Sequence, residues 1–429
     1  MFENLLFQDK AKEQLLAMIA SGTVPPALLF AGAEGSGKLT AALEFARVLS
    51  CEKEALWNCE CAQCARHRSL THPDLLLFGP RSFPQEPSAA ADYFLRTPNA
   101  TSYYTFVRAV RKLLKRFDPA LWSGEEARLS KAASSIEAIE EQLQDISSML
   151  ASGHTQKLGD TANRIVETAL SLESLVPDGI PVFMVRNMAA WASLTPAGKR
   201  KTIILQNADT ANESARNAML KILEEPPESV RFVLTASRRA TVIATILSRS
   251  RLISFDARTS EQAQQIVSRL FRTQEKVEDV SEFFRKKSPF PPDRAESAAA
   301  LFVGALLADA MRGDEAISGE LASALVSKAR ESRVSVLDVL RSVSEETGGF
   351  GLKNAKFADA PSVFLRAVAR QLARISSDAS SSAALVMLVD RLSSKLRDVA
   401  VQNRTYNRSP ELLLEAFANI FGVSHESSV

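Results

Sequence analysis

A glycine-rich segment near the N-terminus carries the residue types that bind phosphate. Residues 32–38, Gly-Ala-Glu-Gly-Ser-Gly-Lys, fit the pattern G-x-x-x-x-G-K. Glycines let backbone N–H groups approach phosphate oxygens, and a lysine at the start of a helix adds positive charge. The candidate nucleotide-binding residues are therefore Gly32, Gly35, Ser36, Gly37, Lys38, Leu39 and Thr40.

The groups that would hold magnesium beside this loop are missing. Leu39 stands where the pattern has serine or threonine, and Thr40 lies one residue late. The apolar run 203–205 leads into Gln206 and Asn207, where a hydrolytic site has carboxylates. Magnesium favours carboxylate ligands, and hydrolysis needs a charged group to orient or deprotonate water. We therefore expect that ATP or ADP can bind, that Mg²⁺ binding is doubtful, and that catalysis is lost.

A cluster of thiols forms a second candidate site, between residues 51 and 64. The spacing is C-x7-C-x-C-x2-C, and the chain has no other cysteine. Four thiolates suit a closed structural zinc site, whereas a disulfide framework would be spread over a small secreted chain. His67 or His72 could replace one ligand, and a redox role or unliganded thiols are the alternatives. The predicted zinc ligands are Cys51, Cys59, Cys61 and Cys64.

Short apolar runs and helical periodicity give the elements that must position these residues. A wholly apolar run at 27–31 predicts a strand buried on both faces, and further buried strands are predicted at 74–78, 202–205, 231–235 and 252–255. Helical spacing predicts helices at 9–19, 39–50 and 212–225. Strands that alternate with helices indicate a parallel α/β sheet, with the glycine loop between the first strand and its helix.

About 100 residues of different character, roughly 81–178, interrupt the predicted sheet. Apolar residues at helical spacing over 129–150 and 158–176 flank a short glycine turn, which predicts an antiparallel helical hairpin. A basic stretch from Arg108 to Arg116 precedes the hairpin. It is interpreted either as a solvated helix face or as a contact with phosphate, DNA or a partner. The sequence does not indicate what the insert binds.

The C-terminal part has no further strand signal. A compact amphipathic helix is expected at 260–272, and the proline-rich residues 288–293 predict a linker. From 295 to about 421, helical segments indicate an all-α bundle.

Composition limits the classes of function. Of 429 residues, 46% are hydrophobic and 24% are charged, so a globular chain of about three domains is expected. The net charge is only +2, so attraction for nucleic acid must be local or borrowed from partners. No run approaches the roughly 18–20 apolar residues that span a bilayer, and the N-terminus has no leader pattern. We expect a soluble, cytoplasmic protein without membrane contact.

Several motifs, taken in order, resemble those of clamp-loader AAA+ subunits of bacterial DNA polymerase III, the group with delta-prime and gamma/tau subunits. Residues 217–227, Asn-Ala-Met-Leu-Lys-Ile-Leu-Glu-Glu-Pro-Pro, resemble the family stretch N-A-L-L-K-x-L-E-E-P-P. Residues 245–250, Thr-Ile-Leu-Ser-Arg-Ser, stand where the family has T-I-x-S-R-C. The resemblance covers residues 1–80 and 180–255 by motif. Weaker matches are the opening Phe2-Glu3-Asn4 with Gln8, and His72-Pro73-Asp74 before the second strand.

The resemblance implies a domain organisation. Residues 1–255 would form an α/β RecA-like AAA+ domain, which contains a zinc module at about 51–72 and the helical insert at about 81–178. Residues 256–290 would form a small helical lid. Residues 291–429 would form an all-α collar through which five subunits join.

The resemblance also implies a function in DNA replication. Arg249 would act in trans as an arginine finger, since a guanidinium fork can stabilise charge on a neighbouring subunit's nucleotide; otherwise it is an exposed arginine before a strand. The implied partners are gamma/tau and delta subunits in a hetero-pentamer, the sliding clamp and, through the assembly, primer–template DNA. The damaged magnesium site favours a non-hydrolysing delta-prime stator in this polymerase complex. The alternative is an active gamma/tau-type ATPase in which Thr40 and Asp209 hold magnesium.

Overall fold

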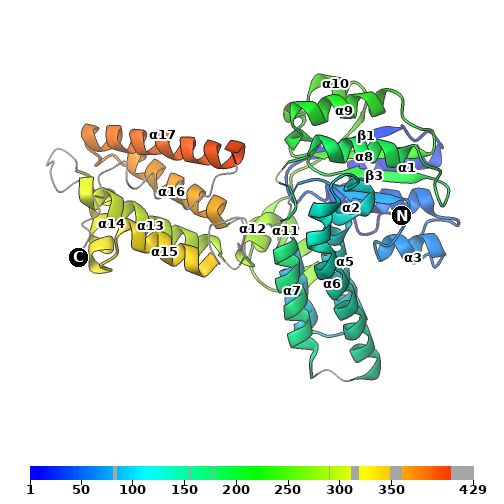
Figure 1. The fold of residues 1–429 in the computed structure, drawn as a ribbon, viewed down its shortest axis with the longest axis horizontal. Coiled ribbons are helices and arrows are strands. Elements are labelled where there is room, and N and C mark those ends of the chain that lie inside the picture. Colours follow the sequence, from blue (N-terminus) through cyan, green and yellow to red (C-terminus); the bar gives the residue numbers. More distant parts are fainter. Residues whose placement is uncertain are drawn as a thin grey trace. The chain divides into compact units, whose positions relative to one another are not determined.

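Five parallel strands form the sheet around which the N-terminal part of the chain is built (Figure 1). They are adjacent in the order β2-β3-β4-β1-β5, and every pair is parallel. The parallel α/β sheet predicted from the alternating signals is thus confirmed. The strands are β1 (Ala27–Gly32), β2 (Leu75–Phe78), β3 (Lys201–Leu205), β4 (Val230–Ala236) and β5 (Arg251–Phe255).

The computed structural model describes residues 1–80, 85–153, 156–173, 175–177, 179–288, 290–310, 318–347 and 360–406. The chain divides into two units, Met1–Phe284 and Arg285–Val429. Each is described by itself.

Burial on the two faces of the sheet explains the apolar strand sequences. Leu28 and Phe30 of β1 point into one core cluster, whereas Leu29 of the same strand points into another. Residues that alternate along a strand face opposite sides, so a strand covered on both sides is mostly apolar, although β3 also buries Lys201 and Thr202. The prediction of a strand buried on both faces fails for β5, which exposes Ser254 within the predicted range and Arg251 just before it. β5 lies at one edge of the sheet, whereas β2 at the other edge is wholly buried.

Helices connect the strands and cover the sheet. The phosphate-loop helix α2 follows β1 directly, and α9 corresponds to the family-like stretch at 217–227. The helices of this unit outside the insert are α1 (Asp9–Ala20), α2 (Lys38–Ser50), α3 (Ala62–Arg68), α8 (Val182–Ala192), α9 (Glu213–Glu224), α10 (Ala244–Leu247), α11 (Ser260–Phe271) and α12 (Val280–Lys286). Short 3-10 turns are η1 (Lys115–Phe117), η2 (Pro119–Leu121), η3 (Ala208–Thr210) and η4 (Arg239–Thr241).

The insert between β2 and β3 is helical, and it contains the predicted hairpin. Its helices are α4 (Glu86–Arg96), α5 (Ala100–Leu114), α6 (Glu126–Ser152) and α7 (Leu158–Glu173). Figure 1 shows α6 and α7 side by side, running away from the sheet. The apolar stripes at helical spacing are buried, including Ile139 and Leu143 of α6 and Ile165 of α7. Arg81, His154 and Asp178, at the predicted limits and turn, lie outside the described residues.

The second unit is helical, as the sequence predicts. It consists of α13 (Pro292–Ala310), α14 (Glu320–Glu331), α15 (Val336–Thr347), α16 (Ala360–Ser377) and α17 (Ala383–Tyr406). These helices share one apolar core, in which Phe302 and Phe364 meet edge to face. Pro289 of the predicted linker and residues 407–429 lie outside the described part. The predicted lid and collar boundaries, 256–290 and 291–429, stay predictions.

None of the described helices is both long and apolar enough to cross a bilayer.

Candidate nucleotide and metal sites

The glycine loop has the backbone form that its sequence predicts. It joins the end of β1 to the start of α2, and both Gly35 (φ 73°) and Gly37 (φ 100°) are in the left-handed region. A Cβ atom on Gly37 would lie only 2.8 Å from an Arg258 nitrogen. The left-handed dihedral angle favours glycine there, and a larger residue would also displace the end of the Arg258 side chain.

Lys38 lies buried inside this loop. Its Nζ donates to the carbonyl oxygens of Gly32 and Ala33, each at 2.6 Å, and lies 3.5 Å from Ser36 Oγ. Burial lowers the pKa of the ammonium group to about 8. The lysine remains protonated at neutral pH and is positioned to meet an anion.

Arg258 supplies a second cation at the loop, which the sequence analysis missed. Its guanidinium donates to the carbonyl oxygens of Gly35 (2.5 Å) and Leu6 (3.3 Å). Burial lowers the pKa of Arg258 to about 10. No short motif marks this residue, because it follows β5, more than 200 positions along the chain from the loop.

A cavity of about 350 Å³ opens beside the loop. Lys38, Thr40, Asp209 and Arg258 provide polar groups, and Phe271 is among the apolar side chains of the wall. A concave site with an apolar wall and a few converging polar groups is typical of small-ligand binding. Of the predicted loop residues, Gly35, Gly37, Lys38, Leu39 and Thr40 line the cavity, whereas Gly32 and Ser36 contact the lysine.

At the end of β3, the side chain of Gln206 is occupied by a hydrogen bond with an arginine. Gln206 is buried, and its Oε1 accepts a hydrogen bond from Arg116 Nη2 at 2.8 Å. Arg116 is itself buried and also donates to the carbonyl oxygens of Gly79 and Pro80. A guanidinium thus borders the position at which a hydrolytic site has a magnesium-binding carboxylate. The positive charge of Arg116 would repel a metal cation at this position.

A carboxylate does lie in the cavity, on Asp209. Its Oδ2 accepts hydrogen bonds from Ser237 Oγ (2.7 Å) and Thr241 Oγ1 (3.0 Å). Its Oδ1 is buried and has no hydrogen-bond partner. Asn207 has a left-handed backbone (φ 51°), and its backbone N–H donates to Thr235 Oγ1 at 3.0 Å.

The basic side chains of residues 108–116 form ion pairs and hydrogen bonds with other parts of the same chain. None of these five side chains is exposed. Arg111 pairs with Glu140 at 2.8 Å and Lys112 with Glu86 at 2.5 Å. The interpretation as a solvated helix face is therefore wrong for this chain. Further contacts are those of Arg108 with the His67 and Arg68 carbonyls, Arg111 with the Ser69 carbonyl, Lys115 with the Leu75 carbonyl and Asp118, and Arg116 at the end of β3.

The four cysteines converge at the other end of α2. Cys51 follows this helix, Cys59 lies in the next loop, and Cys61 and Cys64 lie at the start of α3. Their Sγ atoms all lie within 4.8 Å of one another, with Cys51 3.7 Å from Cys59 and 3.8 Å from Cys61. Sulfurs bound tetrahedrally at about 2.3 Å from a zinc ion would be separated by about 3.8 Å. The arrangement therefore fits a four-coordinate metal ion.

Local electrostatics also suit a cation at the cluster. Burial opposes ionisation of Cys61, but hydrogen bonds from the backbone N–H groups of Glu52 and Cys64 outweigh it and lower the Cys61 pKa to about 6. Burial, together with the neighbouring sulfurs of Cys51 and Cys61, raises the pKa of Cys64. A bound cation would compensate the charge of several thiolates held this close.

Neither histidine belongs to the sulfur cluster, so the alternative ligand sets with His67 or His72 are not supported. The two rings stack on each other at 4.0 Å. Burial, reinforced by His72, lowers the pKa of His67 to about 2, so His67 is neutral. His72 is held through both ring nitrogens, by Gln63 Oε1 (2.9 Å) and the Asp74 backbone N–H (3.0 Å).

Arg249 lies at the surface between α10 and β5. Its Nη2 lies 2.5 Å from Glu224 Oε1, and its Nη1 donates to the Thr245 carbonyl oxygen at 2.9 Å. The side chain is 31% exposed. Glu224 belongs to the family-like stretch at 217–227, so α9 and the T-I-L-S-R-S segment meet at this ion pair.

A comparison with known proteins places these features in a family. The family model described as "DNA polymerase III, delta subunit" matches residues 7–259, more than half of the chain. The chain is similar to replication factor C subunit 2 of Arabidopsis thaliana, with 37% identity over 108 residues, which cover 24% of this chain and 31% of that protein. It is also similar to DNA polymerase III subunit delta' of Yersinia pestis, with 42% identity over 52 residues, 12% of this chain and 15% of that protein.

These matches span less than a third of the length of either curated relative. Among solved structures, a gamma subunit-related protein of DNA polymerase III from Thermotoga maritima aligns over 96% of this chain and 98% of its own. Its identity is 12% and its TM-score is 0.37, too low to carry an argument.

Proposed function

The chain belongs to the DNA polymerase III delta subunit family, and on that premise we propose that it is a delta-prime-type clamp-loader subunit. Membership identifies it as a clamp-loader-like AAA+ protein of replication. In the proposed role it does not hydrolyse ATP. It joins gamma/tau and delta subunits in a hetero-pentamer that places the sliding clamp on primer–template DNA.

The observation that carries this proposal is the hydrogen bond between Arg116 and Gln206 at the end of β3. A magnesium-dependent hydrolase needs negative charge at this point to bind the metal and to activate water. Here a neutral amide is tied to a buried guanidinium, and Leu39 provides no hydroxyl from the loop. The half of the site that holds phosphate, with Lys38, is kept. The arrangement suits nucleotide binding without turnover.

Arg249 would perform the catalytic task of this subunit, in trans. Its guanidinium is partly exposed and lies at the surface, so a neighbouring subunit could approach it. The contact with Glu224 holds the fork in place but, as an ion pair in water, contributes only about 0–1 kcal/mol. Exchange of that carboxylate for the phosphates of a neighbour's nucleotide is therefore energetically accessible.

The four cysteines would hold one structural zinc ion. Their sulfur spacing and burial fit a closed tetrahedral site with no open position for a substrate. Such an ion would fix the loop between α2 and α3.

The proposal is tested in a loader reconstituted with the other subunits of its own complex. Arg249→Ala should reduce the ATP turnover of the assembly by about 10³-fold or more at the neighbouring site, without preventing assembly. Lys38→Ala in this chain should leave the turnover unchanged. If Lys38→Ala abolishes turnover and Arg249→Ala does not, the assignment is reversed.

One observation favours a second candidate function, an active gamma/tau-type ATPase. Asp209 Oδ1 is buried without a partner in the cavity that Thr40 and Lys38 also line. A carboxylate oxygen and a nearby hydroxyl could together bind magnesium. In that case Asp209→Asn would abolish Lys38-dependent ATP hydrolysis by the isolated chain.

A further inference from the structure

A buried arginine joins the thiol cluster to the phosphate-loop helix. Arg47 lies on the last turns of α2 and is only 2% exposed. Its Nε and Nη2 donate to the two carboxylate oxygens of Glu44, at 2.9 and 2.6 Å. The remaining donors reach the carbonyl oxygens of Ala55 (2.8 Å) and Leu56 (3.1 Å) and the Sγ of Cys64 (3.0 Å). Five hydrogen bonds match the five N–H groups of a guanidinium.

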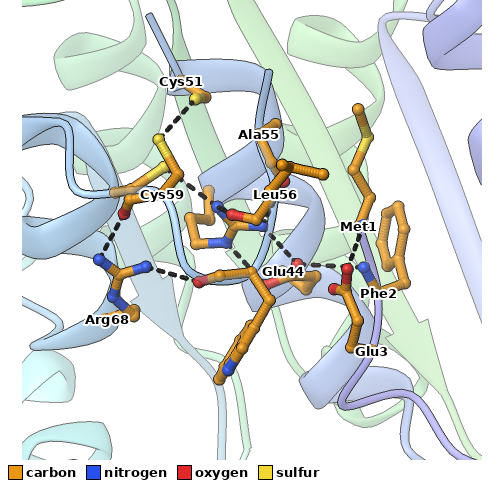
Figure 2. Close-up of polar contacts among 12 residues, drawn as sticks. Met1, Phe2, Glu3, Glu44, Cys51, Ala55, Leu56, Cys59 and Arg68 are labelled. Carbon is orange, nitrogen blue, oxygen red and sulfur yellow. Dashed lines mark hydrogen bonds and ion pairs between the residues drawn. The ribbon is translucent and has the colours of Figure 1, made fainter. Parts of the chain in front are cut away.

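The same ion pair also holds the start of the chain. Glu44 Oε1 accepts a hydrogen bond from the backbone N–H of Phe2 at 3.2 Å. Figure 2 shows Phe2, Glu44, Ala55 and Leu56 gathered around this point, with Cys51 and Cys59 nearby. Three segments therefore meet at one ion pair: the N-terminal residues, α2 and the loop that carries the cysteines.

The contact between Arg47 and Cys64 has a specific consequence if the cluster binds metal. Four thiolates around one divalent cation carry a net charge of −2, and Cys64 is fully buried. A guanidinium N–H that points at a thiolate sulfur compensates part of this charge, and the effect is large where water is excluded. It also fixes the direction from which the sulfur meets the metal.

We propose that Arg47 is a positioning residue of the metal site. It holds the Cys64 thiolate through its Nη1 and thereby retains the metal ion. Glu44 keeps the guanidinium aligned for this contact. The inference rests on the proposed metal binding by the four cysteines and adds to it a residue outside the ligand set.

A matched arginine in the same module separates this role from ordinary packing. Arg68 donates to the carbonyl oxygens of Trp57 (2.7 Å) and Cys59 (2.5 Å), so its guanidinium is engaged by backbone oxygens rather than by a sulfur. Both arginines thus hold the cysteine-bearing loop by donating hydrogen bonds to its backbone carbonyl oxygens. Arg68→Gln should disturb the loop without touching the charge on the thiolates.

The experiment follows the transfer of zinc from the full-length, zinc-loaded protein to a chromophoric chelator. Outer-shell partners typically change metal affinity by 10- to 100-fold, so Arg47→Gln should speed zinc release by at least about 10-fold. Arg68→Gln should stay within about threefold of the unsubstituted chain. Equal release by the unsubstituted chain and Arg47→Gln, or equal acceleration by both variants, would overturn the role of Arg47.

Two further measurements keep the test decisive if Arg47→Gln folds poorly. Glu44→Gln leaves the arginine in place but weakens its alignment, and should give an intermediate release rate; an unchanged rate would contradict the role given to Glu44. In the cobalt-substituted protein, Arg47→Lys should shift the thiolate-to-cobalt absorption band, which a purely packing role would leave unmoved. If the unsubstituted chain binds no stoichiometric metal, the metal proposal itself fails, a result distinct from a metal site indifferent to Arg47.

Discussion

The cysteine cluster and the glycine loop lie at opposite ends of helix α2, and they differ in how many of their expected ligand groups are present. At its C-terminal end the four sulfurs converge, and a buried arginine contacts one of them. At its N-terminal end the loop keeps its glycines and Lys38, but the metal-binding side of the site has Leu39 and Gln206. The first would offer a metal ion four sulfur ligands. The second keeps cations that would hold an anion, but Leu39 and Gln206 offer no negative charge to a metal ion.

The difference between the two sites suggests that nucleotide binding and ATP hydrolysis can be separated in this chain. A site that loses its magnesium ligands while it keeps its phosphate-binding lysine can hold nucleotide as part of the structure. The helix between the two sites then joins two places at which a ligand would stabilise the fold. The comparison gives four predictions, which are described from the largest expected effect to the smallest.

Loss of the metal cluster should have the largest effect. Cys64→Ser removes a fully buried ligand, so the protein should lose its stoichiometric metal and about 4 kcal/mol or more of its free energy of unfolding. Metal content and denaturant unfolding measure both. Glu60→Gln, an exposed neighbour of the ligands, should change neither. A Cys64→Ser protein as stable as the parent would show that the cluster is not a structural metal site.

The affinity for nucleotide should depend on pH through Lys38. The free protein keeps this lysine protonated below its pKa of about 8, and a bound phosphate favours the protonated form. The affinity for ADP should therefore be highest below pH 8 and fall by up to about tenfold per pH unit above it. Calorimetric titration between pH 7 and pH 9.5 measures this. Lys38→Arg stays charged and should remove the dependence; an identical slope in that variant would exclude Lys38 as its source.

Arg258 should contribute less than the loop lysine. Arg258→Gln removes a cation that donates to the Gly35 carbonyl oxygen, and should weaken ADP binding by about 5- to 10-fold, or about 1 kcal/mol. Arg251→Gln is the control, because Arg251 is exposed on the edge strand β5. Equal effects of both substitutions would indicate only a loss of general positive charge.

Removal of the Thr40 hydroxyl should have the smallest effect. If this site binds nucleotide without magnesium, Thr40→Ala should leave ADP affinity within about twofold, both with magnesium and with a chelator present. The same titrations measure it. A tenfold loss that appears only in magnesium would assign Thr40 to a working metal site and remove the contrast between the two ends of α2.

The sequence was sufficient where local residue types decide the structure. Mostly apolar runs located the five strands because both faces of the sheet are largely covered, and the expected burial failed at the exposed positions of β5. The close spacing of the cysteines predicted their convergence. Leu39 and Gln206 stand in the sequence where a hydrolytic site would have magnesium-binding side chains, which is the basis of the proposal that catalysis is lost.

Contacts between distant segments were beyond such reasoning. Arg258 reaches the glycine loop from the segment after β5, the strand next to β1, and Arg116 reaches Gln206 from the insert. Both side chains look like surface charges in the sequence, and only the fold brings each to a site. The interpretation of the stretch from Arg108 to Arg116 as a solvated helix face fails for the same reason, since the partners of its side chains come from other helices, strands and loops.

The central claim is that this chain has the phosphate-binding half of an ATPase site without the catalytic half. Steady-state ATP hydrolysis by the isolated, metal-loaded protein tests it most directly, with Lys38→Ala measured beside it in the presence of magnesium. The account predicts no turnover above that of Lys38→Ala. Substantial turnover that Lys38→Ala abolishes would contradict it and would identify the chain as an active ATPase.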